Sequence, residues 1–238
     1  MSCVLTKIKI QGYRIHRDLT VKPNCKFNII VGANESGKST LIEAIALALT
    51  GRINGRSASE ELNPHWFNTV IVEEFIRKRK SGLLEGFPEI LIELSFDNVP
   101  ELQSLCGAIN TYVPTHACPG VTMKVTPNPE YAVDLEAWAK APTPLLPVEY
   151  YKCDWRSFAD KEITSRPKIL ATAVIDSRTV RASTGIDYHL RQILADQLEP
   201  AERAEISLEY RRVKASMSQT ALSTVNMRMS SVHATLHN

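Results

Sequence analysis

The sequence lacks the features of several protein classes. It has no apolar run of about 18 residues, the length that a membrane-spanning helix needs, so we expect no membrane span. Its opening residues follow an amphipathic strand pattern and lack the continuous apolar core of a signal peptide. The five cysteines are odd in number and form no C-x-x-C pair, which argues against a disulfide framework or a zinc site. We therefore expect free thiols in a cytoplasmic protein.

A large excess of positive or negative charge is also missing. The formal net charge is +2, so total charge neither favours nor excludes a nucleic acid partner. The 238 residues are 44% hydrophobic, which is typical of one large globular domain or of one domain plus a small one. One basic run, at residues 77–80, predicts either a contact with a phosphate backbone or a solvated helix end.

The most informative stretch is residues 26–51, KFNIIVGANESGKSTLIEAIALALTG. An apolar run predicts a strand, Gly32 and Gly37 bracket a loop, and an Ala- and Leu-rich segment ending at Gly51 predicts a helix. The loop matches G-x-x-x-x-G-K-[ST], the phosphate-binding loop, in the strand–loop–helix context that this motif requires.

The spacing of this motif has a chemical reason. Its glycines allow backbone angles that a Cβ would forbid, so successive N–H groups turn inward on an anion. The helix that starts near Gly37 directs its free N–H groups and positive dipole end at the same anion. We expect Lys38 to act as the catalytic cation at the β- and γ-phosphates and Ser39 to bind Mg²⁺. The predicted nucleotide-binding residues of the loop are Gly32, Ala33, Asn34, Glu35, Ser36, Gly37, Lys38, Ser39 and Thr40.

Periodicity predicts the other elements. Residues 4–10 and 18–22 alternate as two short strands ahead of the loop strand. Further strands are predicted at residues 88–97, 120–128, 130–138 and 148–155, and a short helix at 100–109, whereas 70–80 fits either a strand or a short helix. From Asp187 onward the pattern is helical, with a coiled-coil-like seam that ends at Leu236. This seam either packs on the chain's own core or contacts a second copy.

The paired strands, Tyr13-Arg14 and GANESGKSTLIEAI together resemble the N-terminal lobe of the SMC/RecF-like branch of ABC ATPases, over roughly the first 50 residues. The Asn34-Glu35-Ser36 filling of the loop is most similar to the overcoming-lysogenisation-defect (OLD) family, which includes Gabija-type antiphage nucleases. The resemblance places Arg14 near the nucleotide phosphates; a solvated turn residue is the alternative.

The resemblance also implies a fold class and a division of the chain into two parts. Residues 1–186 would form an incomplete α/β P-loop NTPase lobe of ABC type, with N-terminal antiparallel strands and a parallel core sheet. Residues 187–238 would be a helical segment that begins a dimerisation insert. An apolar run at residues 168–176 ends in Asp176, which either holds the magnesium's water as in a Walker B strand or starts a turn after a plain core strand.

The function implied by the resemblance is that of an ATPase module in an OLD-like ATP-dependent DNA endonuclease. ATP and Mg²⁺ would be its cofactors, and ATP binding would close a dimer and gate access of DNA, in antiphage defence. A second copy of the chain, DNA and a helicase-like helper protein are the implied partners. The alternatives are a non-nuclease SMC/RecF-like DNA-repair ATPase and a stand-alone ATP-binding regulatory or interaction protein.

The sequence departs from the family pattern in three respects. No LSGG-like signature follows residue 51, no Asp-Glu pair ends an apolar strand, and no Toprim-type glutamate with a D-x-D motif is present. Without a signature and a base, an attacking water is not oriented and the γ-phosphate charge is not fully clamped. We therefore expect ATP binding with weak or no hydrolysis by this chain alone. We also expect the chain to be a fragment or truncated product of one roughly twice as long or more.

Overall fold

The computed structural model describes residues 5–53, 56–82, 86–140, 145–165, 167 and 170. The chain divides into two compact units, Met1–Val174 and Ile175–Asn238, and the second lies outside the described residues. Asp176, the expected boundary at residue 186 and the helical segment after it also lie outside them. These three expectations therefore stay predictions.

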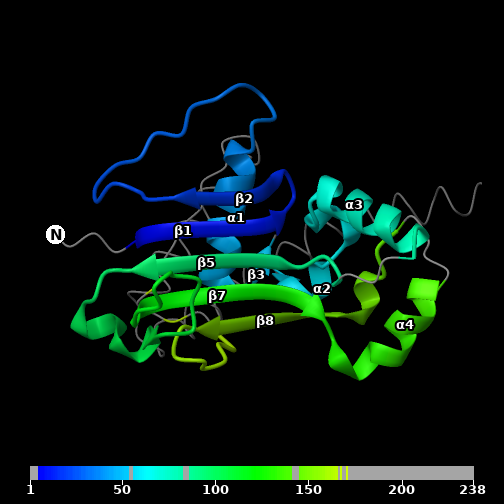
Figure 1. Ribbon diagram of the computed structural model, residues 1–238. Helices are drawn as coiled ribbons and strands as arrows, with labels where there is room; N and C mark the ends of the chain where they lie inside the picture. The colour runs from blue at the N-terminus through cyan, green and yellow to red at the C-terminus, as the bar shows by residue number, and fades with distance from the viewer. Residues whose placement is uncertain are drawn as a thin grey trace, which may run out of the picture. The chain divides into compact units, whose positions relative to one another are not determined.

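A six-stranded sheet organises the described unit, and Figure 1 shows its strands side by side. The strand order is β2-β1-β5-β7-β6, and β8 also pairs with β7. All of these pairs are antiparallel. The strands are β1 (Leu5–Tyr13), β2 (His16–Val21), β5 (Ile90–Phe96), β6 (Cys106–Gly107), β7 (Cys118–Pro127) and β8 (Tyr151–Ser157).

The described helices are short, apart from two. The α-helices are α1 (Lys38–Thr50), α2 (Ala58–Glu61), α3 (Thr69–Lys80) and α4 (Ala132–Lys140). The 3-10 helices are η1 (Pro64–Trp66), η2 (Pro100–Leu105), η3 (Pro129–Tyr131) and η4 (Val148–Tyr150), and a small hairpin consists of β3 (Arg52–Ile53) and β4 (Arg56–Ser57).

The core lies between α1 and one face of the sheet. Helix α1 contacts β1, β5 and β7 and runs across the sheet in Figure 1. Alternate strand residues meet the apolar side of the helix, and the buried set includes Ile10, Ile92, Leu94, Val121, Met123, Leu41, Ala44 and Leu47. Each fully buried branched side chain contributes about 1.5–3 kcal/mol through removal of apolar surface from water. Packing therefore fixes α1, and with it the phosphate loop at its start.

The end of α1 is anchored as well. Gly51 ends the helix at φ +65°, and a Cβ there would lie 2.6 Å from a ring carbon of Trp155 on β8. The Trp155 indole Nε1 donates a hydrogen bond of 2.8 Å to Ala48 O. The helix is thus held at its C-terminus by β8 as well as along its length by the core.

Several predicted elements are confirmed. The strands predicted at residues 4–10, 18–22 and 88–97 are β1, β2 and β5, and the helix predicted up to Gly51 is α1. The ambiguous residues 70–80 form α3, whose N-cap Asn68 accepts a hydrogen bond from Ile71 N through its side chain.

The strand predicted at residues 130–138 is wrong, because this segment forms η3 and α4. The Asn128 side chain accepts a hydrogen bond from Glu130 N, and Pro129 occupies the first helical position, so a helix start replaces a strand. Within α4, Leu135 is buried and Trp138 stacks on Phe75 of α3 at 6.2 Å between ring centroids.

The strand predicted ahead of the phosphate loop is also not formed. Phe27, Ile29 and Val31 are 74%, 73% and 83% exposed, on a coil segment that arches away from the sheet (Figure 1). A strand with apolar residues on both faces needs neighbouring strands, and the described residues place none beside it. The expected parallel core sheet is likewise not found among the described strands, whose pairings are all antiparallel.

Candidate nucleotide-binding site

The phosphate loop leads into α1 with the backbone conformation that its glycines allow. Gly37 is the N-cap of α1 at φ +88°, and no side chain caps the helix. A Cβ on Gly32 would lie 2.6 Å from the Ser36 hydroxyl, so the Ser36 side chain would have to turn away from it. Because the N-cap Gly37 has no side chain that could bond them, the first N–H groups of α1 are not capped locally, and such groups bind anions.

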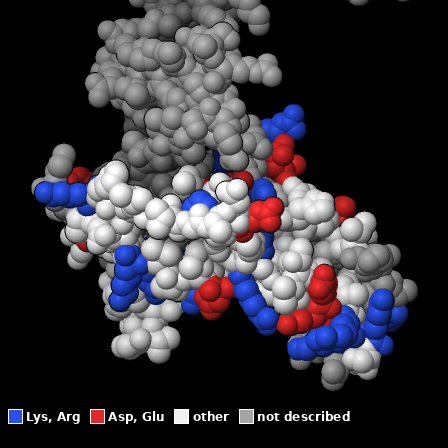
Figure 2. Space-filling view, turned by 90° about the horizontal axis from the view of Figure 1, so that it is seen from above, with Lys and Arg blue, Asp and Glu red and all other residues white. Residues whose placement is uncertain are grey.

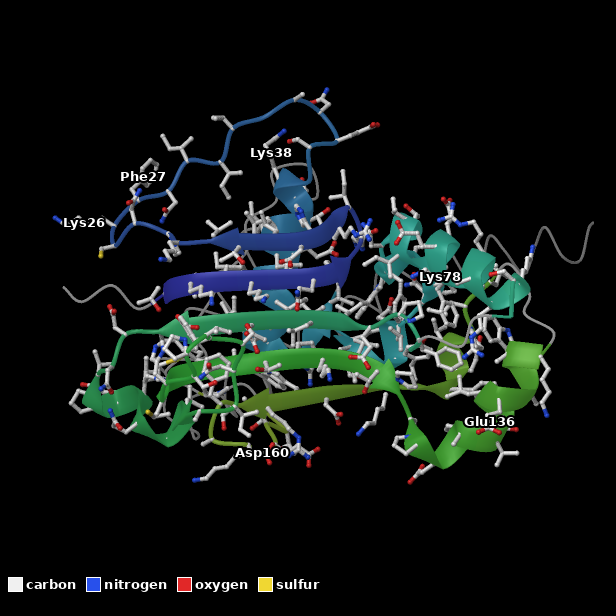
Figure 3. The ribbon with its side chains drawn as sticks, viewed as in Figure 1. Lys26, Phe27, Lys38, Lys78, Glu136 and Asp160 are labelled. Carbon is white, nitrogen blue, oxygen red and sulfur yellow. The ribbon has the colours of Figure 1, made fainter. Side chains whose placement is uncertain are left out.

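Lys38 is turned onto the loop that precedes it. Its ammonium group donates to Gly32 O at 2.7 Å, to Ala33 O at 2.6 Å and to Ser36 Oγ at 3.4 Å. Figure 3 shows its side chain at the start of α1, beneath the arch of the loop. The positive charge of Lys38 thus lies against residues 32–36, directly before the start of α1. Ser39 is exposed and Thr40 is half-buried in the first turn of the helix.

The tip of the β1–β2 hairpin lies against the next turn of α1. Arg14 Nε is 2.8 Å from Glu43 Oε1, and the hydroxyl of the buried Tyr13 donates to the same carboxylate. Burial, followed by the bond to Glu43, raises the pKa of Tyr13 well above its usual range. Tyr13 therefore stays the proton donor to Glu43 even in alkaline solution where a free phenol would ionise.

The backbone of Arg14 is held in a strained conformation. Arg14 is the first of two residues between the paired Tyr13 and His16, and its φ of +48° lies in the left-handed region that favours glycine. Its N–H donates to Trp66 O at 2.7 Å, and its carbonyl accepts from Asn68 Nδ2 at 2.7 Å. Contacts on both sides therefore maintain a turn that an arginine disfavours.

His16, the first residue of β2, contacts the phosphate loop directly. Its Nε2 lies 3.1 Å from Gly37 O. A Cβ on Gly37 would lie 2.6 Å from His16 Cε1 and 2.7 Å from Ile15 Cγ2, so the hairpin tip packs on this glycine.

The structure thus brings Arg14 to α1 beside the predicted loop residues, and Asp176 lies outside the described residues. Sequence reasoning missed His16, Glu43 and the role of Tyr13. The pairing of Tyr13 with His16 around a two-residue turn is the signal that would have placed them at one tip.

The basic run at residues 77–80 forms the last turn of α3. Within it, the Arg79 guanidinium lies over the rings of Phe75 and Phe87, at 5.3 Å and 5.0 Å. On the face shown in Figure 2, the coloured Lys and Arg side chains are interspersed with Asp and Glu, so no patch of one sign marks a nucleic acid surface there. The run is thus a helix end in which Arg79 packs on aromatic rings.

Two absences hold for the part of the chain that the structure describes. No group of three or more His, Cys, Asp or Glu residues within it is arranged to hold a metal ion. No helix within it is long and apolar enough to cross a membrane.

The α/β fold and the loop motif fit a P-loop ATPase lobe. A comparison with protein-family models agrees with this class: residues 7–103, from β1 to η2, match the family described as AAA domain.

A comparison with individual proteins finds a similar sequence in a DNA replication and repair protein. Over 58 residues the chain is 36% identical to the DNA replication and repair protein RecF of Acetivibrio thermocellus. The match covers 24% of this chain and 16% of the RecF protein. The two comparisons support the N-terminal lobe of an SMC/RecF-like ABC ATPase. They do not reach the OLD family, which stays a prediction.

Proposed function

We propose that this chain is an ATP-binding lobe that holds the triphosphate of ATP–Mg²⁺ in residues 32–40. The observation that carries the proposal is the uncapped start of α1, bounded by Gly37, with the Lys38 ammonium group turned onto the same loop. Free helix amides and a neighbouring cation are the groups that bind a polyphosphate.

The loop residues have separable roles in this proposal. The backbone of residues 32–37 surrounds the phosphates, and Lys38 exchanges its present bonds to Gly32 O and Ala33 O for the β- and γ-phosphates. Ser39 offers one hydroxyl from the first helical turn. A single protein oxygen fits Mg²⁺, which takes most of its other ligands from phosphate and water.

Arg14 completes the positive side of the site. Its strained backbone is stabilised by Trp66 and Asn68, although glycine would fit the turn without strain. A strained residue maintained in this way beside the phosphate loop supports a role for its side chain. We assign that role to attraction of the phosphates, with Glu43 holding the guanidinium beside α1.

Arg14→Gly tests this role. The variant relieves the strain and loses a half-exposed ion pair, so we expect the free energy of unfolding to stay within about 1 kcal/mol of the parent. ATP–Mg²⁺ affinity should fall about 3- to 10-fold, since one charged contact is lost. Urea unfolding and calorimetric titration measure the two effects. Unchanged ATP affinity in a folded variant would leave Arg14 as a turn residue only.

Hydrolysis requires groups beyond those described. The carboxylate nearest the loop on α1, Glu43, is engaged by Arg14 and Tyr13, so it is not free to activate water. We propose that Asp176 holds the magnesium's water, that a second subunit supplies the missing groups, and that this chain alone hydrolyses ATP weakly or not at all.

For the complete protein, we propose an ATP-gated dimer that acts on DNA. The loop filling Asn34-Glu35-Ser36 favours an OLD-like nuclease with a role in antiphage defence, whereas the similarity to a RecF protein favours a DNA-repair ATPase without a nuclease. The coding region that adjoins this sequence decides between them. Toprim-type carboxylates downstream support the nuclease, and long heptad repeats without them support the repair ATPase.

Calorimetric titration of the 238-residue chain with ATP in Mg²⁺ buffer tests the central proposal. We expect saturable binding, with weaker binding when EDTA removes Mg²⁺, because the metal neutralises part of the triphosphate charge. GTP and CTP serve as comparisons for base preference. A folded chain that gives no heat with any nucleoside triphosphate would refute the assignment.

A further inference from the structure

The hydrogen bond between β2 and the phosphate loop has a direction. Gly37 O accepts from Leu41 N at 2.9 Å, which is the first helical bond of α1, and it also lies 3.1 Å from His16 Nε2. A carbonyl oxygen only accepts, so Nε2 must carry a proton and donate. His16 is therefore in the Nε2–H tautomer or doubly protonated.

The bond from His16 to Gly37 O affects the N–H of Lys38, one of the amides proposed to bind the phosphates. The peptide unit that joins Gly37 to Lys38 is planar and trans, so its C=O and its N–H point in opposite directions. Since the C=O of Gly37 points along α1 toward Leu41, the N–H of Lys38 points out of the helix start. A donor on the carbonyl fixes this orientation and also polarises the N–H, which makes the amide a stronger donor.

The imidazole of His16 is well placed for this task. Its residue is paired with Tyr13 across the hairpin, and the next residue, Arg17, makes a two-pronged ion pair with Glu74 of α3 at 3.1 Å and 2.9 Å. A Cβ on Gly37 would overlap the imidazole, so the ring lies directly against the backbone that it bonds. The donor is thus preorganised before any ligand arrives.

We propose that His16 is a positioning residue for phosphate binding, acting through the peptide between Gly37 and Lys38. This inference rests on the proposed nucleotide site and adds to it a residue from outside the loop. The ligand class that it affects is the polyphosphate itself, because the amide involved faces phosphate and not the base.

Two substitutions separate the donor from the packing. His16→Phe keeps an aromatic ring against Gly37 and removes the donor, whereas His16→Gln keeps a donor near the position of Nε2 and packs less well. His116→Ala is the control, since His116 contacts the Tyr112 ring on the segment before β7. Each full-length variant is titrated with ATP–Mg²⁺ and with Mg²⁺ tripolyphosphate, and its thermal midpoint is measured without ligand.

We expect His16→Phe to weaken both ligands by the same factor, about 3- to 10-fold, with a thermal midpoint close to that of the parent. His16→Gln should stay within about 2-fold of the parent, as should His116→Ala. Parent-like affinity of His16→Phe would overturn the inference. Equal losses in both His16 variants with lowered midpoints would overturn it too, because packing would then explain the effect. A parent chain that binds neither ligand refutes the nucleotide site itself.

Discussion

Replacing Lys38 with alanine is expected to lower the affinity for ATP–Mg²⁺ by about 100-fold or more. The ammonium group makes charge-assisted bonds to the β- and γ-phosphates in the proposed complex, and each bond of this kind contributes about 1.5–3 kcal/mol. In the free chain the same group is bonded to two exposed loop carbonyls, which water can replace. The folded state should therefore lose little stability, and titration calorimetry with a circular dichroism melt measures both quantities.

Lys26→Ala is the matched control for this experiment. Lys26 lies on the same arching segment but far from Lys38 in Figure 3. Lys26→Ala removes one positive charge, as Lys38→Ala does, so a loss of affinity caused by total charge alone would appear in both variants. Tight ATP binding by a folded Lys38→Ala variant would contradict the proposed site.

Replacing Gly12 with alanine is expected to destabilise the described unit by about 3 kcal/mol or more. Gly12 has φ +69°, and a Cβ there would lie 2.2 Å from Glu89 O, a backbone atom beside β5. The substitution therefore combines an unfavourable backbone conformation with a clash that no side-chain rotation relieves. The displacement also disturbs the bond from Asn68 N to Gly12 O, on which the hairpin tip depends. Urea unfolding measures the free energy.

Substitutions at two other glycines separate the cost of the backbone conformation from the cost of the clash. Gly82 has φ +84°, and a Cβ added there would meet nothing within 4 Å, so Gly82→Ala reports the backbone cost alone, about 1 kcal/mol. Gly86 has neither feature, and Gly86→Ala should be close to neutral. A Gly12→Ala variant no less stable than Gly82→Ala would show that β1 and β5 separate at little cost.

The sequence predicts an element well where one local pattern determines it. The sequence of β1 alternates because one face of this strand lies on the core, and β5 alternates in the same way although Glu93 and Ser95 on its other face are also buried. The end of α1 at Gly51 follows from a glycine that adopts a left-handed conformation. The sequence pattern of residues 130–138 predicts a strand, since Tyr131, Val133 and Leu135 also alternate. The start signal at Asn128-Pro129 and the contact of Trp138 with α3 decide the outcome, and the second of these is not local.

The candidate site also has a part that the sequence predicts and a part that it does not. Its loop is visible as a motif because one short segment contains the glycines, Lys38 and Ser39. The bonds from Tyr13 to Glu43 and from His16 to Gly37 join residues 30 and 21 positions apart, so no local pattern reveals them. The segment ahead of the loop has the composition of a buried strand, but a strand forms only where another lies beside it.

The place of β1 in the sheet bears on how this protein emerges from the ribosome. β1 pairs with β2 nearby in the chain, but its other neighbour, β5, begins only at Ile90, and β7 follows at Cys118. A nascent chain that ends after α1 already contains the whole loop motif but, of the strands that α1 contacts, only β1, and it lacks β5 and β7. The ability to bind a nucleotide should therefore arise only after β5 and β7, which support α1, have been synthesised.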